Sequence, residues 1–214
     1  MKKHYIFDFD GTLFDSMPYW ASSMIKLLDS YNISYPADVI KRITPLGYQG
    51  TARYFHELGL QMEHEQIIRA MEANAYPAYR DVIELKDGVR EYLEYLRSKG
   101  CRLHVLTASP HLMVDVCLKR NGVYDWFDNV WTCDDFALAK SNPQIYRNAM
   151  ARLDAEMDEG VFFDDNIHSV QTAMEAGLLA VGCFDESGKT FEEELKSSAD
   201  RYVYSFKELM DVEL

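Results

Sequence analysis

The chain has 214 residues, of which 48% are hydrophobic, and this is enough to bury the core of one domain with a smaller companion. A formal net charge of −13 argues against nucleic acid or an anionic membrane as a partner, and no stretch approaches the roughly 20 apolar residues that cross a bilayer. No long apolar segment follows the first residues, so we expect a cytoplasmic protein, and nothing in the sequence implies a protein partner.

Short apolar runs rich in β-branched and aromatic residues alternate with segments of helical periodicity along most of the chain. The expected strands are residues 4–9, 102–106, 129–132, 161–163, 179–184 and 201–204. Helical periodicity recurs between them at residues 88–99, 111–120, 143–153 and 168–176. This alternation predicts an α/β fold with a Rossmann-like parallel sheet and helices on both faces.

One region interrupts the alternation, because no strand pattern occurs between Pro18 and Glu84. Its periodic segments are all helical, at residues 18–31, 37–43, 49–58 and 63–84. A plain connection from strand to helix is far shorter. We therefore expect an inserted all-helical cap domain at residues 17–84 and an α/β core domain, with the catalytic site, at residues 1–16 and 85–214. The cap is expected to overhang the carboxyl ends of the strands, where open α/β sheets bind ligands.

Two carboxylates, Asp8 and Asp10, stand at the end of the first apolar run, within YIFDFDGTLFDS from Tyr5. In an extended chain alternate side chains share a face, so both carboxylates would point the same way. They repel each other unless one is protonated or a cation lies between them. Gly11 permits a turn and a close approach of backbone amides to an anion. The alternative is the tip of a hairpin, which an Asp-Gly pair also favours.

Three more polar groups follow later strands. Thr107–Ser109 precede Pro110 and a helix, which suits either an anion cradle or an ordinary helix cap. Lys140 precedes another helix and could equally be a solvated loop residue. Asp164 and Asp165 directly follow a buried run, where a divalent cation would offset their charge. Because the carboxyl ends of parallel strands share one edge, we expect all these groups to converge with the first two acids.

Taken together, these segments resemble the four motifs of the haloacid dehalogenase-like hydrolases. The segments are DFDGTLFDS from Asp8, LTAS from Leu106, AKSNPQIY from Ala139, and FFDDN from Phe162 with VQTAMEAG from Val170. The resemblance covers essentially the whole chain. The helical insertion is similar to the small helical cap of the phosphoglycolate phosphatase and β-phosphoglucomutase branch.

The resemblance implies a role for each acid. Asp8 would be the nucleophile and a Mg²⁺ ligand. Asp10 would be the general acid and base and would offer its backbone carbonyl to the metal. Asp165 would bind Mg²⁺, and Asp164 would be a further metal partner, directly or through water.

The phosphoryl group would be bound by Gly11, by Thr107, by the Ala108 amide and by Lys140, which would also contact the nucleophile. The motif that contains Lys140 differs from that of related proteins at Ala139, where they usually carry glycine.

Substrate choice is expected to lie in the cap, in a glycine-bearing loop between two helices. Its candidate residues are Arg42, Gly47, Tyr48 and Gln49.

The function that the resemblance implies is Mg²⁺-dependent hydrolysis of a small phosphorylated metabolite through an aspartyl phosphate. Asp10 favours an oxygen leaving group over a halide, because a halide needs no proton. One alternative is a phosphosugar mutase, although such relatives carry a histidine soon after the first motif, where this chain has Met17–Trp20. The other is a phosphate-accepting receiver-like domain, in which the lysine would come after both groups of acids rather than before the second.

Overall fold

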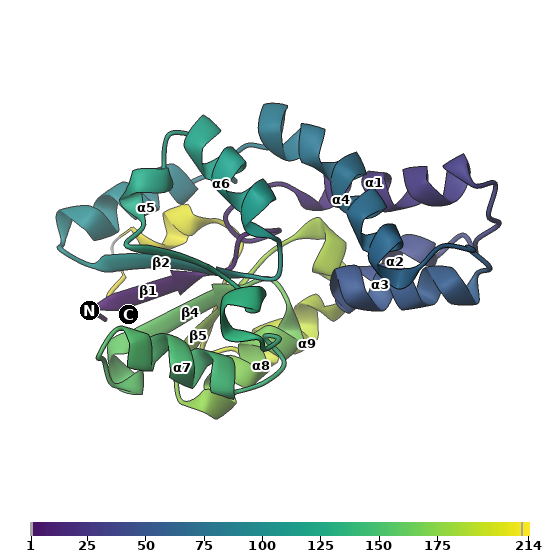
Figure 1. Ribbon diagram of the computed structural model, residues 1–214. Helices are drawn as coiled ribbons and strands as arrows, with labels where there is room; N and C mark the ends of the chain where they lie inside the picture. The colour runs from purple at the N-terminus through teal and green to yellow at the C-terminus, as the bar shows by residue number, and fades with distance from the viewer. Residues whose placement is uncertain (1, 211) are drawn as a thin grey trace. The chain divides into compact units, whose positions relative to one another are not determined.

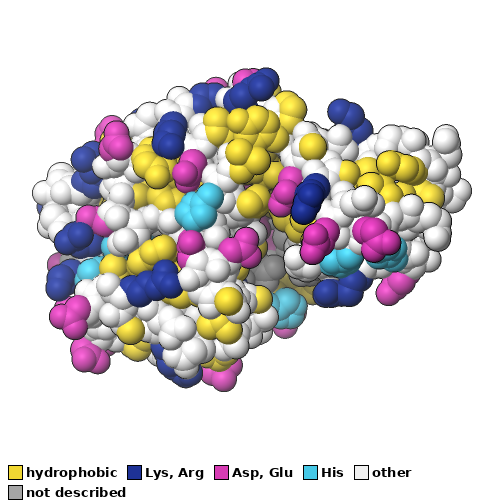
Figure 2. Space-filling view, viewed as in Figure 1, with side chains coloured by type: hydrophobic (Ala, Val, Ile, Leu, Met, Phe, Trp, Pro, Cys, Tyr) yellow, Lys and Arg dark blue, Asp and Glu magenta, His cyan; other side chains and the backbone are white. Residues whose placement is uncertain are grey.

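A computed structural model describes residues 2–210 and 212–214 and divides the chain into two compact units (Figure 1). One unit comprises Met1–Asp15 and Glu84–Leu214, and the other comprises Ser16–Ile83. That the second unit serves as a cap stays a prediction. Among the described helices, none is both long enough and apolar enough to span a bilayer. Acidic and basic side chains are interspersed on the face drawn in Figure 2.

The first unit is built on a six-stranded parallel sheet, which confirms the predicted fold class. In spatial order the strands are β3 (Asn129–Thr132), β2 (Arg102–Thr107), β1 (His4–Phe7), β4 (Gly160–Asp164), β5 (Leu179–Cys183) and β6 (Arg201–Val203). From β1 the chain builds outward through β2 and β3, and it then returns to place β4 on the other side of β1. The carboxyl ends of β1 and β4 are therefore the point at which the strand order reverses, where doubly wound sheets bind ligands.

Helices cover both faces of this sheet. They are α5 (Val89–Ser98), α6 (His111–Arg120), α7 (Gln144–Arg152), α8 (Ile167–Ala176) and α9 (Glu192–Ser198). Short 3₁₀ helices are η2 (Tyr124–Trp126), η3 (Cys133–Phe136), η4 (Met157–Glu159), η5 (Glu186–Phe191) and η6 (Phe206–Leu209). Figure 1 shows α5 and α6 on one side of the sheet and α7 and α8 on the other. This is the arrangement that right-handed crossovers in both directions from β1 produce.

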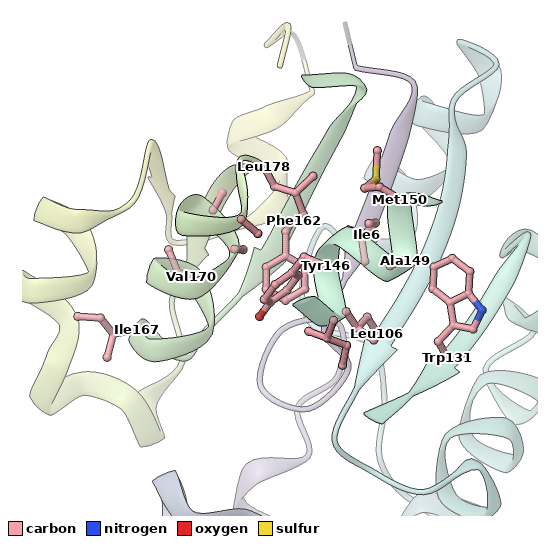
Figure 3. Packing of buried hydrophobic residues seen from close by; sticks show 14 of the residues in the cluster. Ile6, Leu106, Trp131, Tyr146, Ala149, Met150, Phe162, Ile167, Val170 and Leu178 are labelled. Atoms are coloured by element: carbon pink, nitrogen blue, oxygen red, sulfur yellow. The ribbon is translucent and has the colours of Figure 1, made fainter. Parts of the chain in front are cut away.

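Alternate strand residues supply the core on each face, as the period of two requires. Ile6 and Phe162 lie against Tyr146 and Met150 of α7 in Figure 3. On the opposite face the rings of Phe7 and Phe163 stack with centroids 4.6 Å apart, and Tyr92 of α5 and Phe206 of η6 pack around them. Both central strands are thus buried on two sides, and their carboxyl ends are fixed in place.

The second unit is helical throughout and has a core of its own. It contains α1 (Met17–Ser30), α2 (Val39–Ile43), η1 (Thr44–Leu46), α3 (Gly47–Glu57) and α4 (His64–Asp81). Met24 and Leu28 of α1 pack with Phe55 of α3 and with Ile67 and Met71 of α4. The segment predicted to be a loop around Gly47 is instead helical, because η1 follows α2 directly and α3 begins at Gly47 itself.

A buried histidine pair joins β1 and β2 away from the polar ends of these strands. His104 Nδ1 lies 3.0 Å from Asn129 Nδ2, and its Nε2 lies 3.1 Å from His4 Nδ1. Because the amide nitrogen of Asn129 can only donate, His104 accepts at Nδ1 and donates from Nε2, and both rings are neutral. Burial lowers the pKa of His104 to about 3, and it lowers the pKa of His4 as well.

The free energy of unfolding is expected to decrease as the pH is lowered, because of His104. Its pKa is lower in the folded state, so the unfolded chain binds more protons below about pH 6.5, and stability is lost as the pH falls. Chemical unfolding should show that the wild type loses about 2 kcal/mol more than His104→Phe between about pH 7 and pH 5. The control, His168→Gln at an exposed histidine, should follow the wild type. Parallel pH profiles for the wild type and His104→Phe would contradict the expectation.

Candidate active site

The ammonium of Lys140 lies between two buried carboxylates at the carboxyl edge of the sheet. Its Nζ donates to Asp8 Oδ1 at 2.5 Å and to Asp164 Oδ2 at 2.7 Å. The three side chains are only 12%, 6% and 0% exposed, respectively. Asp8 directly follows β1 and Asp164 ends β4, so the strand order brings together residues that are far apart in the sequence. The alternative reading of Lys140 as a solvated loop residue is wrong.

This burial changes how the charged groups titrate. Burial alone would lower the pKa of Lys140, but the carboxylates of Asp164 and Asp8 outweigh it and hold that pKa well above its usual range. Burial is also the largest influence on Asp8. Burial raises the pKa of Asp8 to about 8, although the attraction of Lys140 opposes the shift. The like charges of Asp164 and Asp10 reinforce it. Because burial and the like charges outweigh the attraction of Lys140, the charged form of Asp8 is disfavoured unless a further positive charge is bound nearby.

A third carboxylate, Asp165, completes an acidic cluster. One oxygen from each of Asp8, Asp164 and Asp165 lies within 4.8 Å of the others. Partial burial and the like charges of Asp164 and Asp8 raise the pKa of Asp165 well above its usual range. Clustered carboxylate oxygens form the donor set that hard divalent cations such as Mg²⁺ prefer, and a cation would offset the excess negative charge. The residues present thus fit a magnesium ion.

The turn after β1 differs from the sequence-based expectation. The predicted strand ran to residue 9, but β1 ends at Phe7, so Asp8 and Asp10 do not lie on one extended strand as expected. The carbonyl of Phe9 accepts from the amides of both Leu13 and Phe14, and the Phe9 and Phe14 rings stack with centroids 4.3 Å apart. This local closure ends the strand and turns the chain back across the edge of the sheet.

Gly11 in this turn has a φ of +75° and leaves no room for a side chain beside the acidic cluster. A Cβ atom there would lie 2.6 Å from Asp165 Oδ2. Next to it, the hydroxyl of Thr12 donates to Asp165 Oδ1 at 3.2 Å and accepts from the Asp165 amide at 3.0 Å. The turn and Asp165 therefore hold each other in position.

Gly11→Ala is expected to destabilise the fold more than Gly100→Ala does. Gly100 has a nearly identical φ of +78° with no atom near its Cβ position, so its substitution measures backbone strain alone, about 1 kcal/mol. Gly11→Ala adds displacement of the Asp165 carboxylate, and we expect a further loss of roughly 1–3 kcal/mol. Urea unfolding of both variants measures the difference, and equal losses would contradict the contact.

Asp10 is bound by a residue that sequence reasoning missed. Ser109 Oγ donates to Asp10 Oδ2 at 2.5 Å, whereas the sequence suggested either an anion cradle or a helix cap at this position. The N-cap of α6 is instead Pro110, without a side-chain cap bond. The one sequence feature that could have indicated this contact is the hydroxyl of Ser109, which stands two residues after Thr107 on the same loop. Thr107 ends β2 fully buried, and its Oγ1 accepts from the Ser109 amide at 3.0 Å, whereas Ala108 is exposed.

Tyr146 of α7 supports the backbone of Lys140. Its buried hydroxyl lies 3.0 Å from the carbonyl oxygen of Lys140 and 3.1 Å from that of Ser169, and it donates to one of them at a time. Its ring packs edge-on against Phe162, with centroids 4.9 Å apart. The helix is thereby fixed to the segment that carries the ammonium.

The residues predicted to set substrate specificity belong to the second unit. The acidic cluster and Lys140 belong to the first unit. Arg42 Nε donates to Asp38 Oδ1 at 3.0 Å, and Gln49 Oε1 lies 2.8 Å from His64 Nε2. The ring of Tyr48 meets Trp20 edge-on, with centroids 6.2 Å apart. Gly47 begins α3 with a φ of +59°. Their role in specificity stays a prediction.

Known proteins share this sequence pattern and this fold. A phosphorylated carbohydrates phosphatase of Thermotoga maritima is 26% identical over 174 residues, which cover 81% of each chain. The pyrophosphatase PpaX of Bacillus velezensis is 29% identical over 178 residues, which cover 83% of this chain and 81% of the relative. The crystal structure of CbbY from Rhodobacter sphaeroides in complex with phosphate covers 98% of this chain and 96% of its own, with a TM-score of 0.86. At 22% identity this likeness concerns the fold alone.

The family model described as haloacid dehalogenase-like hydrolase matches residues 2–177, from β1 to the end of α8. This range includes all four motif segments and every residue of the acidic cluster. The predicted family is confirmed, and the chain belongs to the haloacid dehalogenase-like hydrolases.

Proposed function

We propose that the protein is a Mg²⁺-dependent phosphatase that hydrolyses a small phosphorylated substrate through an aspartyl phosphate on Asp8. The observation that carries this proposal is the buried cluster in which Lys140 contacts Asp8 and Asp164, with Asp165 alongside. Two relatives named as phosphatases support the same reaction class.

The metal would be held by Asp8, Asp164 and Asp165, with the backbone carbonyl of Asp10 as a further ligand. Bound Mg²⁺ supplies positive charge that offsets the charge of the phosphoryl oxygens. Lys140 adds a second positive charge from the protein itself. This matters because a carboxylate anion must approach an anionic ester.

Asp8 attacks phosphorus, so that a bond forms between its carboxylate oxygen and phosphorus while the ester P–O bond breaks. The carboxylic acid of Asp10 gives its proton to the leaving oxygen. Water then attacks the aspartyl phosphate, Asp10 takes a proton from that water, and the bond to Asp8 breaks to release phosphate. Ser109 holds Asp10 throughout by its 2.5 Å hydrogen bond.

The transferring phosphoryl group would be bound by Gly11, Thr107 and the amide of Ala108, together with Lys140. Thr107 accepts from the Ser109 amide, so its own O–H can donate to a phosphoryl oxygen. The exposure of Ala108 is consistent with an amide that a ligand can reach.

The helical unit Ser16–Ile83 would serve as the cap that selects the substrate. Its candidate residues are Arg42, Gly47, Tyr48 and Gln49. The named relatives act on phosphorylated carbohydrates and on pyrophosphate, and both are small phosphorylated compounds.

Phosphate release by the purified protein from a panel of sugar phosphates, phosphoglycolate, nucleotides and pyrophosphate tests the function. We expect release from at least one small ester in Mg²⁺ and none in excess EDTA. Interconversion of sugar phosphate isomers without release of phosphate would contradict it in favour of a mutase. Stable phosphorylation from acetyl phosphate without turnover would contradict it in favour of a receiver-like domain.

A further inference from the structure

Lys86 makes three hydrogen bonds inside the first unit. Its Nζ donates to the carbonyl oxygen of Gly11 at 2.6 Å, to that of Phe184 at 2.5 Å, and to Asp185 Oδ2 at 2.9 Å. An ammonium has three donors, and all three are used. The side chain therefore ties the turn after β1 to the loop after β5.

This contact is unlike the exposed ion pairs of the same region. The side chains of Lys86 and Asp185 are 19% and 7% exposed, whereas the neighbouring pair of Lys207 and Asp87 is 55% and 73% exposed. Exposed pairs contribute little to stability because water competes for both partners. A part-buried ammonium with three fixed acceptors constrains the positions of the groups that it binds.

The backbone around Lys86 is fixed to the same turn. The amide of Lys86 donates to the carbonyl oxygen of Leu13 at 2.9 Å, and the amide of Asp15 donates to that of Glu84 at 3.1 Å. The main chain of Lys86 thus holds one side of the turn, and its ammonium holds the other side at Gly11.

Both segments that Lys86 joins border Asp165. The Cβ position of Gly11 lies 2.6 Å from the Asp165 carboxylate, and Thr12 bonds to both the carboxylate and the amide of that residue. On the other side, the Cβ position of Gly188 lies 3.6 Å from the Asp165 carbonyl oxygen. Asp185 fixes the start of this second segment, because its Oδ1 accepts from the Ser187 amide and hydroxyl at 3.0 and 2.6 Å.

We propose that Lys86 is a positioning residue for the acidic centre, which holds the two segments that flank Asp165 and so fixes this carboxylate for metal binding. This assignment rests on the phosphatase function proposed above. The sequence offered no signal for it, since Lys86 stands in a polar stretch, ELKDG, that reads as a surface turn.

Positioning and simple charge have opposite effects on metal affinity. A fixed positive charge near the centre repels a divalent cation, so its removal alone would tighten Mg²⁺ binding. Loss of the positions of Gly11, Thr12 and Asp165 would weaken it. Groups that orient metal ligands change metal affinity by about 10–100-fold when they are removed.

The test is titration calorimetry with Mg²⁺ as the only ligand, repeated by Mn²⁺ binding in electron paramagnetic resonance. We expect Lys86→Met to raise the dissociation constant for Mg²⁺ by about tenfold or more. Lys207→Met, at the exposed lysine beside it, should stay within about twofold of the wild type. Thermal unfolding of each variant shows whether the fold is retained.

An unchanged or tighter Mg²⁺ affinity in folded Lys86→Met would overturn the assignment. If that variant does not fold, Lys86→Arg decides, because the guanidinium keeps the charge but cannot place three donors in the same way. Weaker binding in Lys86→Arg supports positioning, and unchanged binding overturns it. A wild type that neither binds Mg²⁺ nor releases phosphate overturns the proposed function and this assignment together. A functional wild type beside unaffected Lys86 variants overturns the assignment alone.

Discussion

Asp8→Asn is expected to lower the rate of phosphate release by at least about 10⁴-fold, because an amide cannot attack phosphorus and no other carboxylate takes its place. The substitution should leave the fold intact. Burial already raises the pKa of Asp8 to about 8, so this position tolerates a neutral side chain of the same shape. The free energy of unfolding at neutral pH should therefore not fall.

The matched control is Asp125→Asn, the same substitution at an exposed carboxylate in η2. It should keep full activity. Steady-state assays with p-nitrophenyl phosphate measure both variants, and unfolding in urea checks that they are folded. An Asp8→Asn protein within about tenfold of wild-type activity would show that another group attacks phosphorus.

Lys140→Met is expected to affect both catalysis and folding. Removing one partner of a buried ion pair costs about 3–5 kcal/mol, and here it would leave Asp8 and Asp164 without their ammonium. Activity should fall by at least about 10³-fold, because the phosphoryl group loses a positive charge that a buried site cannot replace with water.

The pH dependence of this loss has a definite sign. Without Lys140 the pKa of Asp8 rises further above its value of about 8, so the folded state binds more protons than the unfolded chain does. The wild type shares this proton excess up to about pH 8, where its Asp8 ionises, so the deficit of the variant relative to the wild type should grow as the pH rises above about 8.

Unfolding in urea with EDTA present, at about pH 7 and about pH 9.5, measures this difference. Lys119→Met removes an exposed lysine 4.0 Å from Asp115 and should match the wild type at both pH values. A deficit in Lys140→Met that is the same at both pH values would contradict the buried pairing.

Much of the arrangement could be predicted from the sequence because it depends on local pattern and on topology. Apolar runs indicated the strands, and a parallel sheet brings the residues after its strands to one edge. This is why Asp8, Lys140 and Asp164 could be expected to lie together although the first two are 132 positions apart in the sequence. The resemblance to the family motifs also implied a specific role for each of these residues.

The remaining features depend on contacts that no local pattern encodes. The strand was predicted to include Phe9, but the packing of that ring on Phe14 ends β1 two residues earlier. The bond from Ser109 to Asp10 could not be predicted, because it joins residues 99 positions apart. The bond between Lys86 and Asp185 spans the same separation, and neither residue carries a motif.

The central claim is that Asp8 forms a covalent bond to phosphorus. Its most direct test uses Asp10→Asn with p-nitrophenyl phosphate, whose leaving group departs without a proton from Asp10. The first step can then proceed while the second lacks its base, so the phosphorylated enzyme should accumulate. After an acid quench, borohydride reduces an acyl phosphate to an alcohol, and mass spectrometry of the digested protein locates it. We expect a burst of p-nitrophenolate and homoserine at position 8 alone. Homoserine at another acid, or steady hydrolysis with no burst and no reduced residue, would contradict the claim.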